Sequence, residues 1–327
     1  PARDKKSEIL FCKNTTKDFG IDVIPFGAIS KELKGEQLAE MFDMYSVGAL
    51  AFSDNMRPVH NSGLFSRALL YAKNFNGLII SFPYEEKISP DGLINEGVIS
   101  TKLGLEGIPD LCEEIMVNRD LLINKYHEGR LHFNILSSKK SIEQIKIAKK
   151  TQNNLSCGTS IFHLLFDDEI INQFDNRFKI LPPFRTKEDR NALLEGVKNG
   201  TIDVITSYHQ PNEKETTNVE FSLSPFGSIG TQVCFPLALT YLKEYIGLEK
   251  IVQCMSINPR TILQCEVPII KEGYGANMTL FNPDKKWIYN KNNNTSMSEN
   301  TGLFGAELNG FVHGTIHESN YHKNLLK

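Results

Sequence analysis

Short apolar runs alternate with longer amphipathic stretches along most of the chain. Strand-length apolar runs, several of them rich in β-branched residues, occupy residues 21–29, 48–54, 77–83, 130–137, 155–161 and 202–208. Apolar residues at helical spacing follow at 32–46, 64–75, 108–126, 141–150, 186–200, 231–245 and 248–257. Strands that alternate with helices through short joints indicate a parallel sheet covered by helices. Thr186, followed by Glu188 and Asp189, predicts where one of these helices begins.

The number of strand–helix units leaves the closure of the sheet open. Six such units fall short of the eight that close the usual barrel. The sequence therefore predicts either an open sheet or a barrel whose first two β/α units precede residue 1. After residue 265 the sequence pattern changes to short segments in which apolar and polar residues alternate, separated by Asn- and Gly-rich turns. We expect a (β/α) barrel over residues 1–265 and a small β domain with a C-terminal tail over 266–327.

Composition excludes several classes of function. The 327 residues are 40% hydrophobic and 23% charged, with a net charge of -3, as in ordinary globular proteins. Near-neutral charge gives no case for binding nucleic acid or an anionic membrane, and the longest apolar runs have only strand length. No signal peptide is visible, although the chain opens at Pro1. Six scattered cysteines without a C-x-x-C pair are typical of reduced, buried thiols in a cytoplasmic protein.

Polar residues at the carboxyl ends of the predicted strands are the candidates for chemistry, because barrel enzymes carry their active sites at that rim. A hydrolytic metal site needs several histidines and carboxylates to converge there, and only Asp54 is well placed. His132 lies three residues before its strand end and His163 lies in an apolar run, and both positions favour hydrogen-bonded core histidines. His209 follows a strand end. At this position two roles remain possible for it, that of a solvated loop residue and that of a metal ligand. The stretch Ser207-Tyr208-His209 marks either a working site or the place of a former one.

The sequence resembles the dihydroorotases of the multifunctional-complex type, in the amidohydrolase superfamily. The blocks that carry the resemblance run in order over nearly the whole chain: DVIPFGAISKEL, GALAFSDNMRPVHNSGLFSRALLYAK, INEGVISTKLGLEGIPDLCEEIMVNRD, FKILPPFRTKEDRNALLEGVKNGTIDVI, SPFGSIGTQVCFPLALTYL, SINPRTIL and GANMTLFNPDKKWIY. The resemblance implies a (β/α)8 TIM-type barrel with a small β-sandwich-like domain built from both chain ends. It also implies that the family's first metal-binding strand lies upstream of residue 1.

The family's metal and catalytic positions fall on residues that are mostly unsuited to them. By the resemblance, Asp54 in FSDNM keeps the metal-bridging position, whereas two histidine ligands fall on Phe82 and Ile135. The catalytic aspartate falls on Ser207, and the histidine after it on Tyr208. Phenylalanine and isoleucine offer no lone pair to Zn²⁺, and serine cannot replace a carboxylate as general base. The resemblance thus predicts a degenerate site in which no cofactor is expected.

Three functions follow as hypotheses. The first is a metal-free, non-catalytic dihydroorotase-like protein with an assembly role, as implied by family members that are structural partners of aspartate transcarbamoylase. The second is an active zinc-dependent dihydroorotase or related cyclic amidohydrolase, with a rearranged site that uses Asp54, His209 and an H-x-H pair upstream of residue 1. The third is a metal-independent binding protein whose rim, with Phe82, Tyr84 and Tyr208, holds a small ligand. Arg185 in PPFR is expected to tie a loop to the barrel, and the family resemblance implies a homodimer.

Overall fold

A five-stranded parallel sheet forms the centre of the fold in the computed structural model, which describes residues 2–318 and 320–324. Its strands lie side by side in chain order: β1 Ala51–Phe52, β2 Leu78–Ser81, β5 Arg130–Phe133, β6 Leu155–Ser160 and β7 Val204–Thr206. Every residue of β2 and β6 is buried. Burial on both faces explains why β2 is a nearly continuous apolar run, whereas β6 consists mainly of small residues that fit the same buried position.

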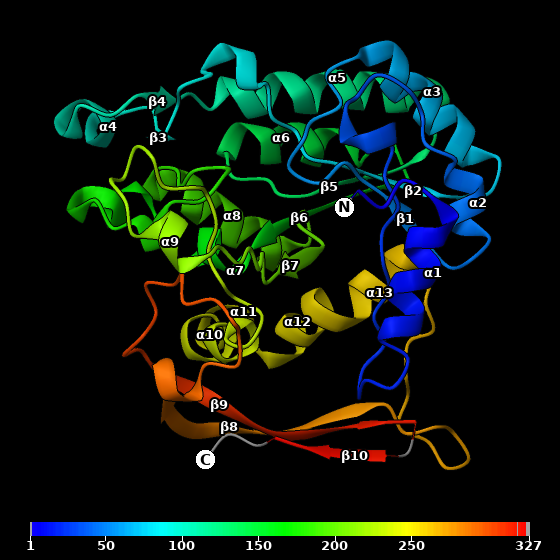
Figure 1. The fold of residues 1–327 in the computed structure, drawn as a ribbon, viewed down its shortest axis with the longest axis vertical. Helices are drawn as coiled ribbons and strands as arrows, with labels where there is room; N and C mark the ends of the chain where they lie inside the picture. Colours follow the sequence, from blue (N-terminus) through cyan, green and yellow to red (C-terminus); the bar gives the residue numbers. More distant parts are fainter. Residues whose placement is uncertain (1, 319, 325–327) are drawn as a thin grey trace.

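Amphipathic helices cover the outside of the sheet, as Figure 1 shows. They are α3 Ser62–Lys73, α5 Leu111–His127, α6 Lys139–Ala148 and α8 Lys187–Asn199. A capping box begins α8, since Thr186 Oγ1 accepts from the Asp189 amide at 3.3 Å and Asp189 Oδ2 accepts from the Thr186 amide at 3.2 Å. The predicted helix start at Thr186 is confirmed.

The first predicted strand, at residues 21–29, is wrong as a strand. Only Gly27 pairs with the sheet, through an isolated parallel bridge to Phe52. Pro25 has no amide to donate, and Ile24 and Phe26 are each 40% exposed, so the segment lies over the rim instead of inside the sheet. The helix expected at 32–46 is also broken, into the 3-10 turn Lys31–Leu33 and α2 Met41–Tyr45. The N-terminal helix α1 Lys6–Thr15 packs beside α2.

The long excursion after β2 forms an arm at one end of the molecule (Figure 1). It holds the 3-10 turn Glu86–Ile88, the short parallel pair β3 Ile94–Asn95 and β4 Gly107–Ile108, and α4 Val98–Leu103 between them. After β6 the chain forms α7 Ile161–Leu165 and the 3-10 turns Asp168–Gln173 and Asn176–Phe178. After β7 comes α9 Lys214–Thr217.

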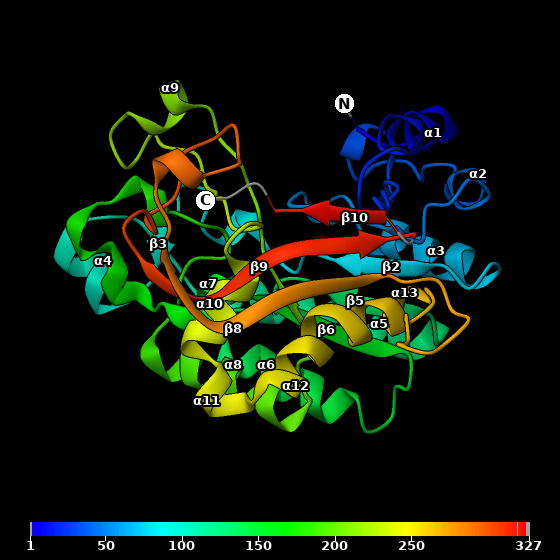
Figure 2. The same cartoon turned by 90° about the horizontal axis from the view of Figure 1, so that it is seen from below.

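The chain then returns along one side of the sheet and ends in a second, antiparallel sheet. Helices α10 Cys234–Tyr241, α11 Lys243–Ile246, α12 Leu248–Val252 and α13 Asn258–Leu263 lead to it, with a π-helical turn at Gln253–Ile257. The sheet has the order β10-β9-β8, with β8 Met278–Ile288, β9 Glu307–His317 and β10 Asn320–Lys323. Figure 2 shows it crossing in front of these helices. The strand β8 is longer than the short segments that the sequence predicts after residue 265, and its pairing with β9 shifts register at Leu280/Phe281 and Asn282/Lys286.

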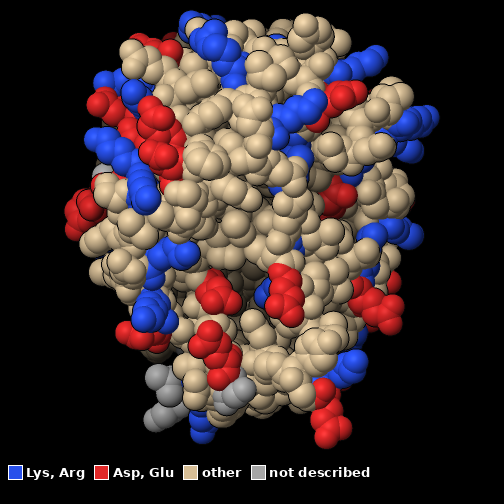
Figure 3. Space-filling model, turned by 90° about the vertical axis from the view of Figure 1, so that its right-hand side faces the viewer, with Lys and Arg blue, Asp and Glu red and all other residues tan. Residues whose placement is uncertain are grey.

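The surface charge and the burial of the cysteines can be compared with what the sequence predicts. Figure 3 shows acidic and basic side chains interspersed over one face of the molecule. No helix among residues 2–318 and 320–324 is long and apolar enough to cross a membrane. The cysteines are free thiols, four of them buried, whereas Cys12 and Cys265 are only half-buried.

Candidate functional site

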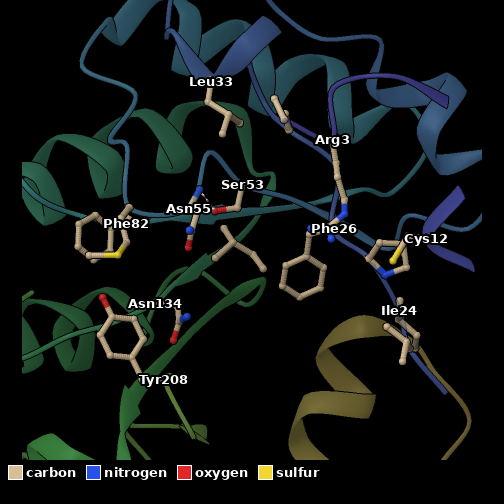
Figure 4. A pocket seen from close by; sticks show the side chains of 16 residues that line it. Arg3, Cys12, Ile24, Phe26, Leu33, Ser53, Asn55, Phe82, Asn134 and Tyr208 are labelled. Atoms are coloured by element: carbon tan, nitrogen blue, oxygen red, sulfur yellow. Dashed lines mark hydrogen bonds between the residues drawn. The ribbon is translucent and has the colours of Figure 1, made fainter. Parts of the chain in front are cut away.

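A cavity of about 530 Å³ lies at the carboxyl ends of the parallel strands, where barrel enzymes carry their active sites. Side chains that follow β1, β2, β5 and β7 form its floor, and the N-terminal segment closes it from above. In Figure 4, Phe82, Asn134 and Tyr208 lie together on one side, with Arg3, Phe26 and Ile24 on the other. Of the sequence-predicted site residues, only Phe82 and Tyr208 line this cavity.

Phe82 stands immediately after β2 and presents its ring to the cavity. Only 6% of the residue is exposed, and its ring centroid lies 6.1 Å from that of Tyr84. Tyr84 lies behind it in an apolar cluster with Cys112 and Leu181 and does not line the cavity. Burial raises the pKa of Tyr84 to about 12, so its phenol stays protonated at neutral pH. The side chain that this edge presents to the cavity, Phe82, is therefore hydrocarbon, with a neutral phenol packed behind it.

After β5, Asn134 reaches the cavity in place of its neighbour Ile135. Ile135 is fully buried and belongs to the packing beneath the rim. The Oδ1 atom of Asn134 is buried without a hydrogen-bond partner among the described residues. The strand therefore offers the cavity an amide, which sequence reasoning missed because Asn134 lies between the apolar residues Phe133 and Ile135.

After β7, Tyr208 and Ser207 point to different surroundings. The Tyr208 side chain lines the cavity and its hydroxyl donates to the carbonyl of Leu181. Burial raises the pKa of Tyr208 above its usual value. Its backbone is left-handed, with φ of 45°, and Ser207 does not line the cavity. The Ser207 Oγ lies 3.5 Å from Thr231 Oγ1, at the edge of a different loop.

Asp54, the carboxylate expected at the rim, is held by the neighbouring backbone. Its Oδ1 accepts from the amides of Ile29 at 2.8 Å and Ser30 at 3.0 Å, and its Oδ2 accepts from the Ser30 hydroxyl. The residue is 3% exposed and absent from the cavity lining. Burial raises the pKa of Asp54, against the lowering effect of these hydrogen bonds. The structure thus uses Asp54 to fasten the segment at residues 29–30.

The histidines are dispersed rather than gathered at the cavity. His132 Nδ1 lies 2.8 Å from Ser156 Oγ, and burial lowers the pKa of His132 to about 3. His163 lies 2.7 Å from Ser160 Oγ through Nδ1 and 3.0 Å from the Pro182 carbonyl through Nε2. Burial lowers the pKa of His163 to about 4. Both are hydrogen-bonded core histidines, as the position of each in the sequence predicts.

His209 is exposed and lies in a separate cavity of about 310 Å³ with Gly230, Thr231 and residues 294–296. Its Nδ1 accepts from the amides of Gly230 at 3.1 Å and Thr231 at 3.4 Å. Burial of part of the ring lowers the pKa of His209. Neither His209 nor Asp54 lines the rim cavity, so that cavity does not bring the two together as a metal site.

Arg185 joins the arm to the barrel. It is 2% exposed, and it donates to Ser137 Oγ at 3.2 Å, Asn95 Oδ1 at 3.0 Å and the Ile108 carbonyl at 2.5 Å. Glu113 completes the cluster by accepting from the Ser137 amide and hydroxyl. The Arg185 guanidinium is therefore occupied by protein groups and does not line the cavity.

The residues present do not fit a zinc ion. Within residues 2–318 and 320–324 there is no group of three or more His, Cys, Asp or Glu side chains that could hold a metal. The cavity offers Arg3, Ser53, Asn55 and Asn134 as polar side chains, none of which is a usual zinc ligand. Its lining also includes the thiol of Cys12, but a single thiolate cannot hold the ion. Sequence reasoning missed Arg3 and Asn55, for which the only signal is that Asn55 directly follows Asp54.

Comparisons with known proteins agree with this fold. A family model described as "Dihydro-orotase-like" matches residues 1–141. A dihydroorotase from Acetivibrio thermocellus is 36% identical over 323 residues, covering 98% of this chain and 76% of that protein. The solved L-hydantoinase (dihydropyrimidinase) of Arthrobacter aurescens superposes with a TM-score of 0.85 at 18% identity, covering 100% of this chain and 76% of that one.

A further solved structure bears on how this fold is used. It is the inactive dihydroorotase-like domain of a CAD-like multifunctional protein from Chaetomium thermophilum. It matches with a TM-score of 0.63 at 14% identity, covering 98% of this chain and 80% of that one. Together with the hydantoinase, it identifies the fold as the TIM-type barrel with a small β domain that the sequence predicts.

Proposed function

Because this chain belongs to the dihydroorotase family, we propose that it is a dihydroorotase-like protein of pyrimidine biosynthesis that no longer hydrolyses a cyclic amide and serves a structural role in the cytoplasm. One observation carries this proposal. The carboxylate that the family resemblance assigns to the metal accepts hydrogen bonds from Ile29 and Ser30 through both of its oxygens, and the side chains at the two histidine positions are hydrocarbon.

The chemistry of hydrolysis requires groups that this rim does not supply. Zinc in amide hydrolysis polarises a carbonyl and lowers the pKa of a bound water. Phe82 and Ile135 have no lone pair with which to hold the ion, and Ser207 has no carboxylate with which to accept a proton. Tyr208 cannot stand in as a base, because burial raises its pKa and its proton is already donated to Leu181. No step of hydrolysis can be assigned to these side chains.

An assembly role suits a barrel that keeps its fold without its site. The polar clusters at the rim, around Asp54 and Arg185, bind segments of this chain to one another. A domain described as inactive has this same fold in the Chaetomium thermophilum protein, so the fold exists apart from the activity. On the family resemblance, we propose aspartate transcarbamoylase as the partner that this protein supports.

The active enzyme is the second candidate, and the names of the relatives favour it. The Acetivibrio thermocellus protein and a second relative, 37% identical, from Caldicellulosiruptor saccharolyticus are both dihydroorotases. For this chain to act likewise, Asp54 would have to exchange its hydrogen bonds for a metal. His209 would have to leave the amides of Gly230 and Thr231.

Genetic complementation separates the two candidates. The full chain is expressed in a bacterial strain that lacks dihydroorotase and requires a pyrimidine, with the Acetivibrio thermocellus enzyme as positive control. We expect growth without pyrimidine only from the control, at equal levels of soluble protein. Growth supported by this chain would establish the active enzyme. The partner is tested separately by co-migration of the purified chain with aspartate transcarbamoylase of the same organism, where separate elution of the two would refute the proposed assembly.

A further inference from the structure

Another cavity lies on the face of the barrel opposite the rim, at the amino ends of the parallel strands. Its volume is about 540 Å³. Gly129, which directly precedes β5, and Asn154, which directly precedes β6, both line it. The carboxyl ends of α3 and α5 and the turn that follows α6 form its walls, and α5 packs against both of the other helices (Figure 1). The amino ends of barrel strands generally serve stability, so a ligand here is separate from the chemistry of the rim.

The lining of this cavity is polar throughout. Four amide side chains, two lysines, a glutamate and a threonine line it together with Gly129, and no side chain among these described residues is hydrocarbon. The amides of Asn153 and Asn154 are exposed, and they form no hydrogen bond with any other part of the chain that the structure describes. An amide side chain offers both donors and an acceptor. The cavity is therefore suited to a ligand that carries many hydrogen-bonding groups.

Asn124 supplies a buried acceptor that lacks a partner. The residue is 2% exposed and lines the cavity. Its Nδ2 donates to Gln152 Oε1 at 2.9 Å, whereas its Oδ1 accepts no hydrogen bond within residues 2–318 and 320–324. A Cβ atom at Gly129 would lie 3.4 Å from this oxygen, so the glycine keeps the space beside Oδ1 free of a side chain. Because a buried carbonyl oxygen without a donor is unfavourable, this position favours a ligand that donates a hydrogen bond.

The charges of the cavity favour an anion. Lys125 is exposed and forms no ion pair within the described chain. Lys73 donates to the His127 carbonyl at 2.7 Å and lies 3.8 Å from Glu128. The contact with His127 offsets the partial negative charge at the carboxyl end of α5, which would otherwise repel an anion. Two ammonium groups thus face one carboxylate, and the cavity carries a net positive charge.

We propose that this cavity binds a phosphorylated sugar, with the phosphate on Lys125 and Lys73 and the sugar hydroxyls on the amides. The two halves of the ligand follow from different observations. The unpaired ammonium of Lys125 calls for an anion. The unpaired Oδ1 of Asn124 calls for a donor, which a phosphate group that is mostly deprotonated at neutral pH does not supply and a hydroxyl does. The volume of about 540 Å³ falls in the range of small-molecule sites and accommodates a hexose phosphate.

Calorimetric titration of the purified full chain with glucose 6-phosphate tests the proposal. We expect saturable binding of about one equivalent with a Kd below about 1 mM, and a rise of the thermal midpoint with the concentration of the ligand. Glucose and inorganic phosphate should each bind at least about 10-fold more weakly, because each offers only one half of the ligand. The absence of saturable binding would overturn the proposal. So would inorganic phosphate that binds as tightly as glucose 6-phosphate, because the cavity would then recognise an anion alone.

Substitutions locate the bound ligand. Lys125→Gln should weaken the binding of glucose 6-phosphate by about 10-fold or more, the factor that a hydrogen bond to a charged group supplies. Asn124→Leu keeps the approximate size of the side chain and removes the acceptor, so it should weaken the binding of glucose 6-phosphate and not that of inorganic phosphate. Lys17→Gln is the matched control, because it removes the same charge from an exposed position outside the cavity and should leave the affinity unchanged.

Circular dichroism of each variant checks that it is folded, and Lys125→Gln, at an exposed side chain, keeps the test valid if Asn124→Leu unfolds. A folded Lys125→Gln protein that binds glucose 6-phosphate with wild-type affinity would place the ligand elsewhere and overturn the proposal. This cavity lies on the opposite face from the rim, so none of these results depends on whether the rim is catalytic.

Discussion

The role assigned to Asp54 is tested by comparing its replacement with asparagine and with alanine. In the structure, Oδ1 of Asp54 accepts from both amides, at 2.8 Å from Ile29 and 3.0 Å from Ser30. Oδ2 accepts only from the Ser30 hydroxyl. An asparagine that keeps its oxygen at the Oδ1 position preserves both amide bonds, and its NH₂ can donate to the Ser30 hydroxyl. Alanine removes all three acceptor contacts in a place that water does not reach.

The expected losses of stability differ several-fold. A buried donor left without a partner costs about 1–3 kcal/mol, so Asp54→Ala, which leaves three donors unpaired, should lower the free energy of unfolding by about 3–9 kcal/mol. Asp54→Asn should cost about 1 kcal/mol, since it rearranges one hydrogen bond and removes a charge whose burial is unfavourable. The raised pKa of Asp54, for which burial is the largest cause, shows that burial of its charge is unfavourable. The larger loss is a sizeable part of the 5–15 kcal/mol that holds a typical protein folded.

Urea unfolding at neutral pH measures both losses. Asp91→Ala, at an exposed turn, is the control and should unfold like the wild type. If Asp54 instead binds a metal, the two substitutions should both remove bound zinc and both abolish any turnover, because an amide is a poor substitute for a bridging carboxylate. Equal destabilisation by Asn and Ala, or loss of bound zinc from the Asn variant, would refute the structural role.

Three further predictions concern the core and the rim. The pKa of His163 is lowered to about 4 from an ordinary value of 6.5, so the neutral ring stabilises the fold above about pH 6.5 and this contribution is lost as the pH falls towards 4. His163→Gln should therefore reduce the pH dependence of the unfolding free energy between pH 6 and 5 by about 1.4 kcal/mol per pH unit, and an unchanged slope would contradict the burial of a neutral ring. Tyr208→Phe should cost about 1–2 kcal/mol by leaving the Leu181 carbonyl unpaired, measured by urea unfolding, and a neutral effect would show that the bond contributes little. Dialysis against a chelator should leave the thermal midpoint unchanged, whereas a fall reversed by zinc would reveal a structural metal.

The sequence predicts the parallel sheet well because its strands are buried on both faces. Residues 78–81 and 155–160 are unbroken apolar or small-residue runs, and they form β2 and β6. The segment at 21–29 has the same β-branched character but lies over the rim, joined to the sheet only at Gly27. Local composition cannot separate these two outcomes, since they depend on whether a neighbouring strand is there to pair.

The residues that line the candidate site are predicted less completely, because the sequence does not show in which direction each side chain points. The side chain of a residue at a strand end can face either the cavity or the neighbouring loop. The local backbone conformation determines which of the two it faces. Asp54 turns to Ile29 and Ser30, and Tyr208, with its left-handed backbone, takes the place in the cavity that Ser207 leaves. Asn134 enters the cavity although the resemblance directs attention to Ile135. Pattern and resemblance locate the rim, and only the structure shows which atoms reach it.

The most direct test of a non-catalytic rim is zinc stoichiometry by elemental analysis, with dihydroorotate hydrolysis assayed on the same sample, purified without chelator. The account predicts no stoichiometric zinc and no turnover, including after zinc is added back, because Phe82, Ile135 and Ser207 supply neither ligand nor base. Stoichiometric zinc together with turnover would contradict it. In that case His209 and His163 are the first residues to substitute, because the metal would have to recruit nitrogens that the structure holds elsewhere.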